Sequence, residues 1–161
     1  MNDTSTTPKP SAPRRRAPAA RSAMSSRFWN FAYDLGDRSE SERVTNIKGG
    51  FKVDWADALK QEFKLPPSAI AHLLSMSSAT YERRRRDDKP LDITASERLD
   101  RIADIALAAE SAFEDNAAAA RWLSTPNQAL GGDSPIMRCE TEIGARQVRR
   151  ILNALEWGGV A

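Results

Sequence analysis

The densest group of chemically active side chains in this 161-residue sequence is a run of four arginines at residues 83–86. A planar guanidinium can pair with the acceptor atoms of guanine, and its fixed charge neutralises phosphates. Successive helical residues are turned by about 100°, so four arginines in a row spread over most of a helix surface. We therefore expect one or two of them near DNA bases, and the others on phosphates or paired with Glu82, Asp87 or Asp88. The alternative is a solvated, salt-bridged helix face.

Side chains suited to catalysis are scarce. His72 is the only histidine and lies in an otherwise apolar stretch, so we expect a structural role rather than that of a base. Cys139 is the only cysteine, which excludes an internal disulfide, and we expect it to be a free, buried thiol. One Cys and one His cannot form a zinc site alone, and no glycine-rich phosphate loop is present. We expect no enzyme, no cofactor and no metal.

Two short helices must position the arginines. The spacing predicts a helix over residues 68–74, a tight turn at residues 75–77 and a second helix over residues 78–87, which Pro90 ends. In a helix-turn-helix the first helix braces the second, whose exposed side chains enter the major groove. The candidate DNA-binding residues are Ser77, Ser78, Thr80, Tyr81, Arg83, Arg84, Arg85 and Arg86.

Further helices are indicated on both sides of this pair. Upstream, the pattern predicts a helix over residues 40–47, ended by two glycines, and a helix capped by Asp54. Downstream, residues 94–97 have the sequence of a capping box that opens a long helix. The apolar stripe of that helix is Leu99, Ile102, Ala106, Ala109 and Phe113.

The last third of the chain is also predicted to be helical. We expect helices over residues 116–124 and 141–157, the second ended by Gly158, and a short helix with Pro135 in its first turn. The inward face of the last helix is expected to be Ala145, Val148, Leu152 and Leu155. No alternating strand pattern and no repeat is present, so the predicted fold class is all-α.

Charge divides the chain unequally. Residues 1–90 hold 17 Lys and Arg against 11 Asp and Glu, whereas residues 91–161 hold 7 against 11. This asymmetry suggests one half that faces a polyanion and another with a different partner. No apolar run approaches a membrane span, and the first residues lack the apolar core of a secretory signal. With a single cysteine as well, we expect a cytoplasmic protein.

The N-terminal residues divide into two segments. Residues 1–25 are rich in Pro, Ser and Thr and are expected to be disordered, either as a basic arm for nucleic acid or as a solvated tail. Residues 26–50 begin with an aromatic cluster. Such a cluster can stack on bases, but packing on a core or a subunit interface is the favoured interpretation. Its members are Phe28, Trp29, Phe31 and Tyr33.

Residues 121–146 describe a small helical module with specified turns. Pro126 and Asn127 shape one turn, and the glycine pair at residues 131–132 permits positive φ in the next. Gly144 allows another backbone to approach closely. These residues indicate packing and contain no catalytic chemistry.

Two motif sets resemble those of a known family. Ile70, Ala71 and Met76 match the Xre/Cro type of helix-turn-helix, with Ser75 where glycine is usual and Arg84 where a buried apolar residue is expected. The second set is similar to the toxin-binding domain of the Xre/MbcA/ParS antitoxins, and the combined likeness covers about residues 44–161. Its residues are Arg121-Trp122-Leu123-Ser124-Thr125-Pro126-Asn127, Leu130-Gly131-Gly132, Ser134-Pro135, Thr141-Glu142 and Gly144-Ala145-Arg146-Gln147-Val148.

The resemblance implies an antitoxin whose partner is a RES-domain toxin that consumes NAD. Such an antitoxin blocks the toxin's active site and represses the shared operon, as a homodimer on an inverted repeat in the operator. Contacts on the last helix are chosen among its arginine and tryptophan residues, because these residue types are favoured in interface cores. For Trp122 the alternative is that its side chain is an ordinary core residue. The candidate toxin-binding residues are Trp122, Leu130, Gly131, Gly132, Pro135, Arg146, Arg149, Arg150, Trp157 and Gly158.

We therefore predict a helix-turn-helix domain at residues 51–110 and a toxin-binding domain at residues 111–161, after the tail and the aromatic segment. The alternative function is a stand-alone transcriptional regulator that uses its C-terminal half only to dimerise. A third interpretation is sequence-independent RNA or DNA binding through the basic tail and the arginine run.

Overall fold

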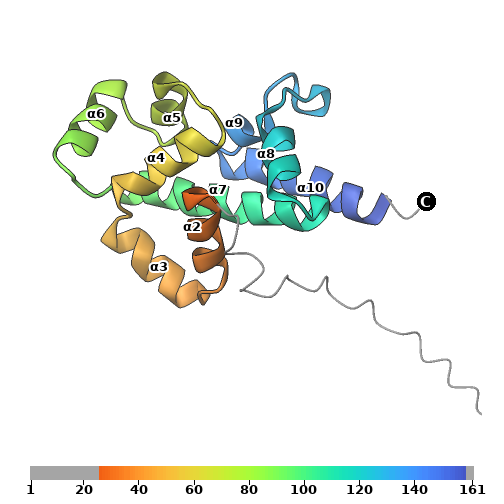
Figure 1. Cartoon of the computed structure of the whole chain (residues 1–161), viewed down its shortest axis with the longest axis horizontal. Helices are drawn as coiled ribbons and strands as arrows, with labels where there is room; N and C mark the ends of the chain where they lie inside the picture. Colours follow the sequence, from red (N-terminus) through yellow and green to blue (C-terminus); the bar gives the residue numbers. More distant parts are fainter. Residues whose placement is uncertain (1–25, 159–161) are drawn as a thin grey trace, which may run out of the picture.

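The computed structural model describes residues 26–158, and all regular structure in that range is helical, as predicted (Figure 1). The predicted disordered tail at residues 1–25 lies outside the described residues, as do residues 159–161. The elements are α2 (Arg27–Gly36), α3 (Glu40–Gly49), α4 (Val53–Glu62), α5 (Pro67–Leu73), α6 (Ser78–Arg86), α7 (Ile93–Phe113), α8 (Asn116–Ser124), the 3-10 turn η1 (Gln128–Leu130), α9 (Pro135–Arg138) and α10 (Glu142–Gly158).

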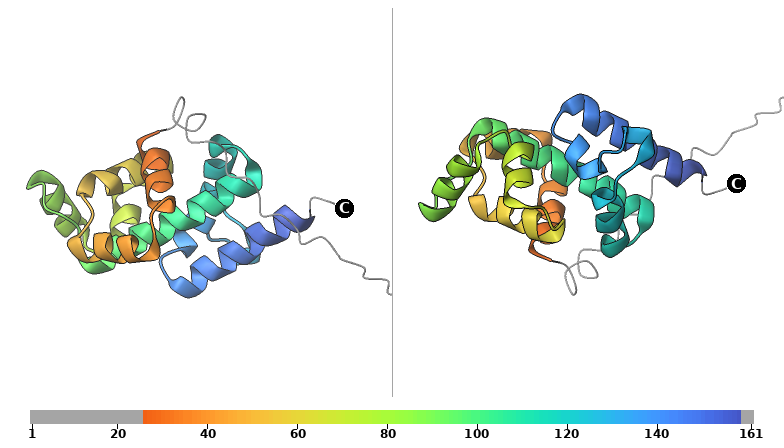
Figure 2. Two further views of the ribbon diagram at one scale, coloured as in Figure 1. Left: turned by 90° about the horizontal axis from the view of Figure 1, so that it is seen from below. Right: turned by 90° about the horizontal axis from the view of Figure 1, so that it is seen from above.

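Helix α7 is the structural axis of the molecule. It is 21 residues long, and α2, α3, α8 and α10 all pack against it. Figure 2 shows it running from the end that holds α3 to α6 into the end that holds α8 to α10. Its predicted apolar stripe is buried at Leu99, Ile102, Ala106 and Ala109, and Phe113 is half-buried. Burial of this stripe from several sides contributes hydrophobic stabilisation that joins the two ends.

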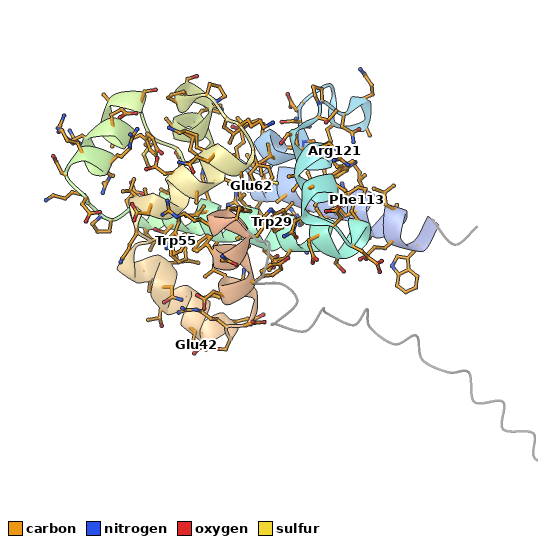
Figure 3. The ribbon with its side chains drawn as sticks, in the orientation of Figure 1. Trp29, Glu42, Trp55, Glu62, Phe113 and Arg121 are labelled. Carbon is orange, nitrogen blue, oxygen red and sulfur yellow. The ribbon has the colours of Figure 1, made fainter. Side chains whose placement is uncertain are left out.

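The aromatic cluster of α2 lies in the core, as favoured. The ring centroid of Phe28 is 5.6 Å from that of Trp29 and 5.1 Å from that of Phe63, both in edge-to-face geometry. Phe31 stacks on Trp55 at 4.6 Å. Because Trp29 is 1% exposed, its indole needs an internal partner, and its Nε1 donates to Glu62 Oε1 at 2.7 Å (Figure 3). These rings attach α2 to α4 and are not available to stack on bases.

Two predicted helix starts are wrong by one or two residues. Helix α4 begins at Val53, so Asp54 lies in its first turn and the cap position is Lys52. Helix α7 begins at Ile93, and the Asp92 carboxylate accepts a hydrogen bond from the backbone N–H of Ala95. In both cases a residue earlier in the chain already has the extended backbone that a cap requires. The true capping box is at Ser39 and Glu42, before α3.

The remaining helical predictions need smaller corrections, since α5 lies one residue earlier than predicted and α10 one residue later. Helix α8 has the predicted bounds, and α6 begins at the predicted residue. On α10, Ala145, Val148 and Leu152 are buried as expected, but Leu155 is 45% exposed because α10 extends past the end of α7. None of the helices within residues 26–158 is long and apolar enough to span a membrane.

Candidate DNA and partner interfaces

Helices α5 and α6 form the predicted helix-turn-helix. Ser75 has φ +61°, so it takes the left-handed conformation that glycine usually supplies at this turn. Met76 is half-buried against the core, and its N–H donates to the carbonyl of Ala71 at 2.9 Å. Ser77 then caps α6, since its Oγ accepts from the backbone N–H of Thr80 at 3.1 Å. The first turn of α6 is therefore fixed, with Ser77 and Ser78 exposed.

Helix α6 lies at the outer edge of the molecule and has a single buried residue (Figure 1). That residue is Tyr81, which is 0% exposed and whose hydroxyl donates to the carboxylate of Asp57 on α4. Burial, and then the bond to Asp57, raise the pKa of Tyr81 well above its usual value. This burial argues against the predicted contact of Tyr81 with DNA. Its ring anchors α6 to the rest of the domain.

The four arginines of α6 have four different environments. Arg84 is half-buried, and its Nη1 donates to the carbonyl of Pro90 at 2.5 Å. Arg85 Nε lies 3.6 Å from Asp57 Oδ2, and Arg86 Nε lies 3.2 Å from Asp87 Oδ1. Arg83 is exposed and, within the described part of the chain, makes no ion pair. The prediction that the run divides between free and paired members is consistent with these contacts, and the Arg84 guanidinium is bonded to the backbone that follows α6.

The loop between α8 and α9 projects from the other end of the molecule (Figure 1). Asn127 organises it: its N–H donates to the carbonyl of Asp133, and its own carbonyl accepts from the N–H of Gly132, both at 3.0 Å. Gly131 and Gly132 have φ of +71° and +91° and are exposed, as a contact surface requires. Trp122, by contrast, packs on Phe113 with ring centroids 5.8 Å apart.

Two of the candidate toxin-binding residues lie in the core. Leu130 is 2% exposed, and Pro135 is also buried at the start of α9. Their burial argues against their assignment as contacts, because neither side chain is part of the accessible surface. The half-buried Trp122 fits the core alternative weighed for it from the sequence.

Helix α10 has one buried face and one exposed face. Gly144, Ala145, Val148 and Leu152 are buried, and α10 packs on α7. A Cβ atom on Gly144 would lie 1.9 Å from the carbonyl oxygen of Arg138, which confirms the close backbone approach expected there. The opposite face carries large exposed side chains at steps of three, four and seven, which we call the α10 stripe. Its residues are Ile143, Arg146, Arg150 and Trp157.

The α10 stripe is unusually apolar for an exposed helix face. Ile143 is 65% exposed and Trp157 is 69% exposed, whereas most large apolar side chains in the described residues are buried. Ile143 was missed from the sequence. Ile143, Arg150 and Trp157 follow one another at seven-residue steps, and this spacing is the signal that would have found it. Exposed apolar side chains flanked by arginines are typical of a protein-binding surface.

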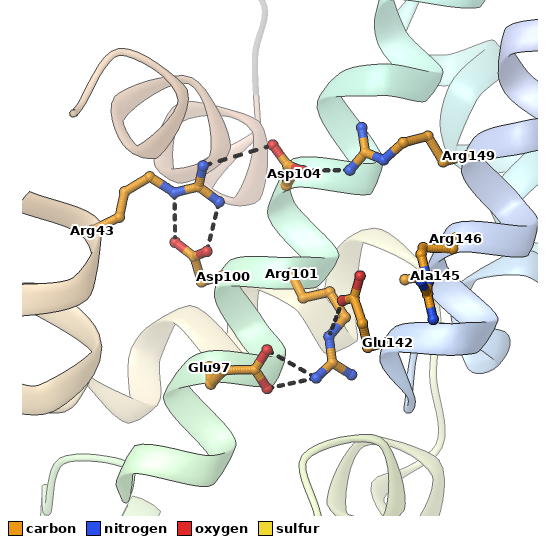
Figure 4. Close-up of a pocket in the computed structure, with 9 residues that line it drawn as sticks. All are labelled: Arg43, Glu97, Asp100, Arg101, Asp104, Glu142, Ala145, Arg146 and Arg149. Atoms are coloured by element: carbon orange, nitrogen blue, oxygen red, sulfur yellow. Dashed lines mark hydrogen bonds and ion pairs between the residues drawn. The ribbon is translucent and has the colours of Figure 1, made fainter. Parts of the chain in front are cut away.

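Arg149 lies outside the stripe. It forms an ion pair with Asp104 of α7, and Asp104 also lies 3.9 Å from Arg43 of α3. Arg43 is in turn paired with Asp100 at 2.6 Å. Figure 4 shows these residues lining a cleft of about 170 Å³ between α3, α7 and α10. Four arginines and four carboxylates line it, so its formal charges balance, and Arg43, Arg101 and Arg149 form ion pairs with these carboxylates.

The single histidine and cysteine have structural environments. His72 lies on the exposed side of α5, and its Nε2 lies 2.6 Å from Glu140 Oε2. Cys139 is 0% exposed, and burial raises the pKa of its thiol to about 12. Residues 26–158 contain no group of His, Cys, Asp or Glu arranged to hold a metal ion.

Comparison with known proteins gives a consistent pattern. Residues 40–104 match the family described as the antitoxin Xre-like helix-turn-helix domain, and residues 108–158 match the antitoxin Xre/MbcA/ParS C-terminal toxin-binding domain. The chain is 35% identical over 116 residues to the antitoxin Xre of Yersinia enterocolitica, covering 71% of this chain and 78% of that protein. It is 32% identical over 114 residues to the antitoxin Xre of Pseudomonas putida, covering 71% and 70%.

Proposed function

Because this chain belongs to the Xre family of antitoxins, we propose that it neutralises an NAD-degrading RES-domain toxin by covering the toxin's active site. We propose further that it binds operator DNA as a homodimer and so regulates its own operon. Membership of the family makes the chain the antitoxin of a toxin–antitoxin system, with a helix-turn-helix domain. The relatives carry the name antitoxin Xre, and we propose no catalytic function for this chain.

The α10 stripe is the observation that carries the toxin-binding proposal. It lies within the region that matches the toxin-binding family, and it exposes Ile143 and Trp157 to solvent. Covering such side chains removes apolar area from water, and the adjacent Arg146 and Arg150 supply charge and hydrogen bonds that select the partner. The exposed loop at residues 131–132 and Gly158 extend the proposed contact surface.

The DNA-binding proposal rests on the exposed face of α6. Ser77 and Ser78 lie at its capped N-terminus, where hydroxyls and backbone N–H groups suit phosphate oxygens. Among residues 26–158, Arg83 makes no ion pair and Arg86 is paired only with its neighbour Asp87. We propose that these two arginines, with Thr80, provide the principal contacts to operator DNA, and that residues 51–110 and 111–161 divide the two functions.

Co-expression with the adjacent RES-type toxin tests the first proposal. The wild-type chain should restore growth and cellular NAD and should co-purify with the toxin. The double variant Ile143→Ser/Trp157→Ser should lose both effects, because both substituted side chains are exposed and their removal leaves the core intact. Val44→Ser, which alters an apolar residue 49% exposed on α3, is the control. Continued neutralisation by the double variant contradicts the proposed surface.

Titration of the wild-type chain with its own upstream DNA tests the second proposal. Preference for the operator over a scrambled duplex of equal length is expected, with the footprint repeated on two half-sites. The stand-alone regulator gives the same footprint without a toxin partner, so co-purification separates the two functions. Equal affinity for both duplexes would contradict operator recognition.

A further inference from the structure

Helix α6 is held in place by very few side chains. Tyr81 is its only buried residue, and α6 makes its main helix contacts with α4 and α5. Its C-terminal end continues into an exposed turn in which Asp88 has φ +49°. The rotation of α6 about its own axis, which determines the side chains that face DNA, therefore depends on what holds Tyr81.

Tyr81 is held by Asp57 of α4. The carboxylate is only 18% exposed, and its Oδ1 accepts the hydrogen bond from the buried tyrosine hydroxyl. A tyrosine ring without this bond would still be apolar and buried, but it would have no polar partner to fix its direction. A partly buried carboxylate likewise requires a donor to offset its lost hydration. The pair therefore fixes the angle between α4 and α6.

The second oxygen of the same carboxylate faces an arginine. Asp57 Oδ2 lies 3.6 Å from Arg85 Nε, and Glu82 Oε2 lies 3.6 Å from Arg85 Nη1. Arg85 thus has two carboxylates beside it, whereas Arg83 has none among the described residues. A cation already paired with carboxylates releases fewer counterions when it approaches a phosphate, and so contributes less to sequence-independent binding.

We infer that Asp57 is a specificity-determining positioning residue, which fixes the orientation of α6 through Tyr81 and withholds the charge of Arg85 from non-specific DNA binding. This inference rests on the proposed operator binding through α6 and identifies how that same site discriminates. Asp57 acts through these two side chains and need not contact DNA. Its effect is on the ratio of operator affinity to non-specific affinity.

The variant Asp57→Asn tests this inference, because the amide can still accept the tyrosine hydroxyl but no longer neutralises Arg85. Affinity for the operator and for a scrambled duplex is measured over a series of salt concentrations. Non-specific affinity should rise several-fold, and its dependence on salt should steepen by about one counterion. The ratio of operator to non-specific affinity should fall about tenfold. Asp54→Asn on the same helix is the control, since it changes the same charge at an exposed carboxylate 4.0 Å from Arg27.

A second pair of variants keeps the inference testable if Asp57→Asn folds poorly. Arg85→Ala should leave the salt dependence of non-specific binding almost unchanged, whereas Arg83→Ala should lower it by about one counterion. The inference is overturned if Arg85→Ala and Arg83→Ala change the salt dependence of non-specific binding equally. It is also overturned if Asp57→Asn and Asp54→Asn have the same ratio of operator to non-specific affinity. A wild-type chain without operator preference would overturn the proposed function as well, so the two failures are distinguishable.

Discussion

Helices α6 and α10 both carry clustered arginines, but the surfaces around those arginines differ in character. On α6 most exposed side chains are polar or charged, and Tyr81 is the single buried residue. On α10 four residues are buried, and the exposed face combines arginine with Ile143 and Trp157. Binding to a phosphate backbone is strengthened mainly by positive charge and needs little buried area. Binding to a protein partner is strengthened by apolar area that is removed from water. The contrast is what two different partners require.

The same comparison shows that residue type alone does not identify a contact. Arg84 and Arg85 of α6 are held by groups within the chain, namely the carbonyl of Pro90 and the carboxylate of Asp57. Arg149 of α10 is likewise paired with Asp104 of α7, while Arg146 and Arg150 are exposed. In both helices the arginines that remain exposed are the ones suited to an external partner.

The largest expected effect is on the helix that presents the α10 stripe. Gly144→Ala would place a Cβ atom 1.9 Å from the carbonyl oxygen of Arg138, a backbone atom that cannot move without shifting the turn between α9 and α10. We expect a loss of about 3 kcal/mol in the free energy of unfolding, measured by urea denaturation. Toxin binding should be lost with the displaced stripe, whereas α6 and its DNA binding should be affected less.

Gly49→Ala is the matched control, because no atom lies within 4 Å of the added Cβ and α3 ends there in helical geometry. This variant should be neutral or more stable by up to about 1 kcal/mol. If both variants had the same stability, α10 would not be held by this close approach, and the contrast with the loosely held α6 would disappear.

The next effect separates two arginines of α10 that differ in their partners. Arg146→Ala should weaken toxin binding by about 2 kcal/mol, roughly 30-fold, because an exposed interface arginine is removed. Arg149→Ala should change toxin binding much less and instead lower stability by up to about 1 kcal/mol, since Asp104 loses a partly exposed partner. Calorimetric titration with the toxin and urea denaturation measure the two quantities. The opposite order would place the contact surface on the α7 side of α10.

A smaller effect separates two arginines of α6. Arg83→Ala should lower operator affinity about tenfold, because it removes an exposed cation from the DNA-facing helix. Arg84→Leu should leave that affinity almost unchanged, since the Arg84 guanidinium is already bonded to the carbonyl of Pro90. Leucine also restores the apolar residue that this type of helix-turn-helix usually has there, so stability should be retained. Fluorescence anisotropy with labelled operator DNA measures both variants, and a larger loss in Arg84→Leu would contradict this role of Arg84.

The fold was more predictable than the sites, for a physical reason. Helical periodicity and turn residues act locally, so the bounds of α8 and the stripe of α7 could be predicted from the sequence. The sites depend on contacts distant in sequence. Tyr81 was assigned to DNA although its partner Asp57 lies 24 positions earlier, and the pairing of Arg149 with Asp104 spans 45 positions.

Some surface residues could still have been found from local patterns. The spacing of Ile143 from Arg150 and Trp157 is visible in the sequence once Ala145, Val148 and Leu152 are assigned to the opposite face. The burial of Leu130 at the end of η1 and of Pro135 at the start of α9 could not be anticipated in this way. The packing of α9 against α8 and α10 depends on contacts that form only in the folded chain.

The smallest expected effect concerns the buried thiol of Cys139, next to α9. Helix α6, which has a single buried residue, has no such buried thiol. Burial raises the pKa of Cys139 to about 12, above the value of 9.0 for an unperturbed thiol. The unfolded chain therefore releases this proton at a lower pH than the folded chain does. The stability that comes from burying the protonated thiol is fully present below about pH 9 and is lost as the pH rises toward 12. The free energy of unfolding should therefore fall by about 1 kcal/mol between about pH 7.5 and pH 10.

Urea denaturation at each pH measures the free energy of unfolding of the wild type and of Cys139→Ala. The difference between the two isolates the effect of the thiol, because the other titrating groups are common to both chains and the cavity left by alanine adds an offset independent of pH. A difference that stays constant over this range would mean that the thiol is accessible to water, and that the packing of α7, α9 and α10 around it is no tighter than the attachment of α6.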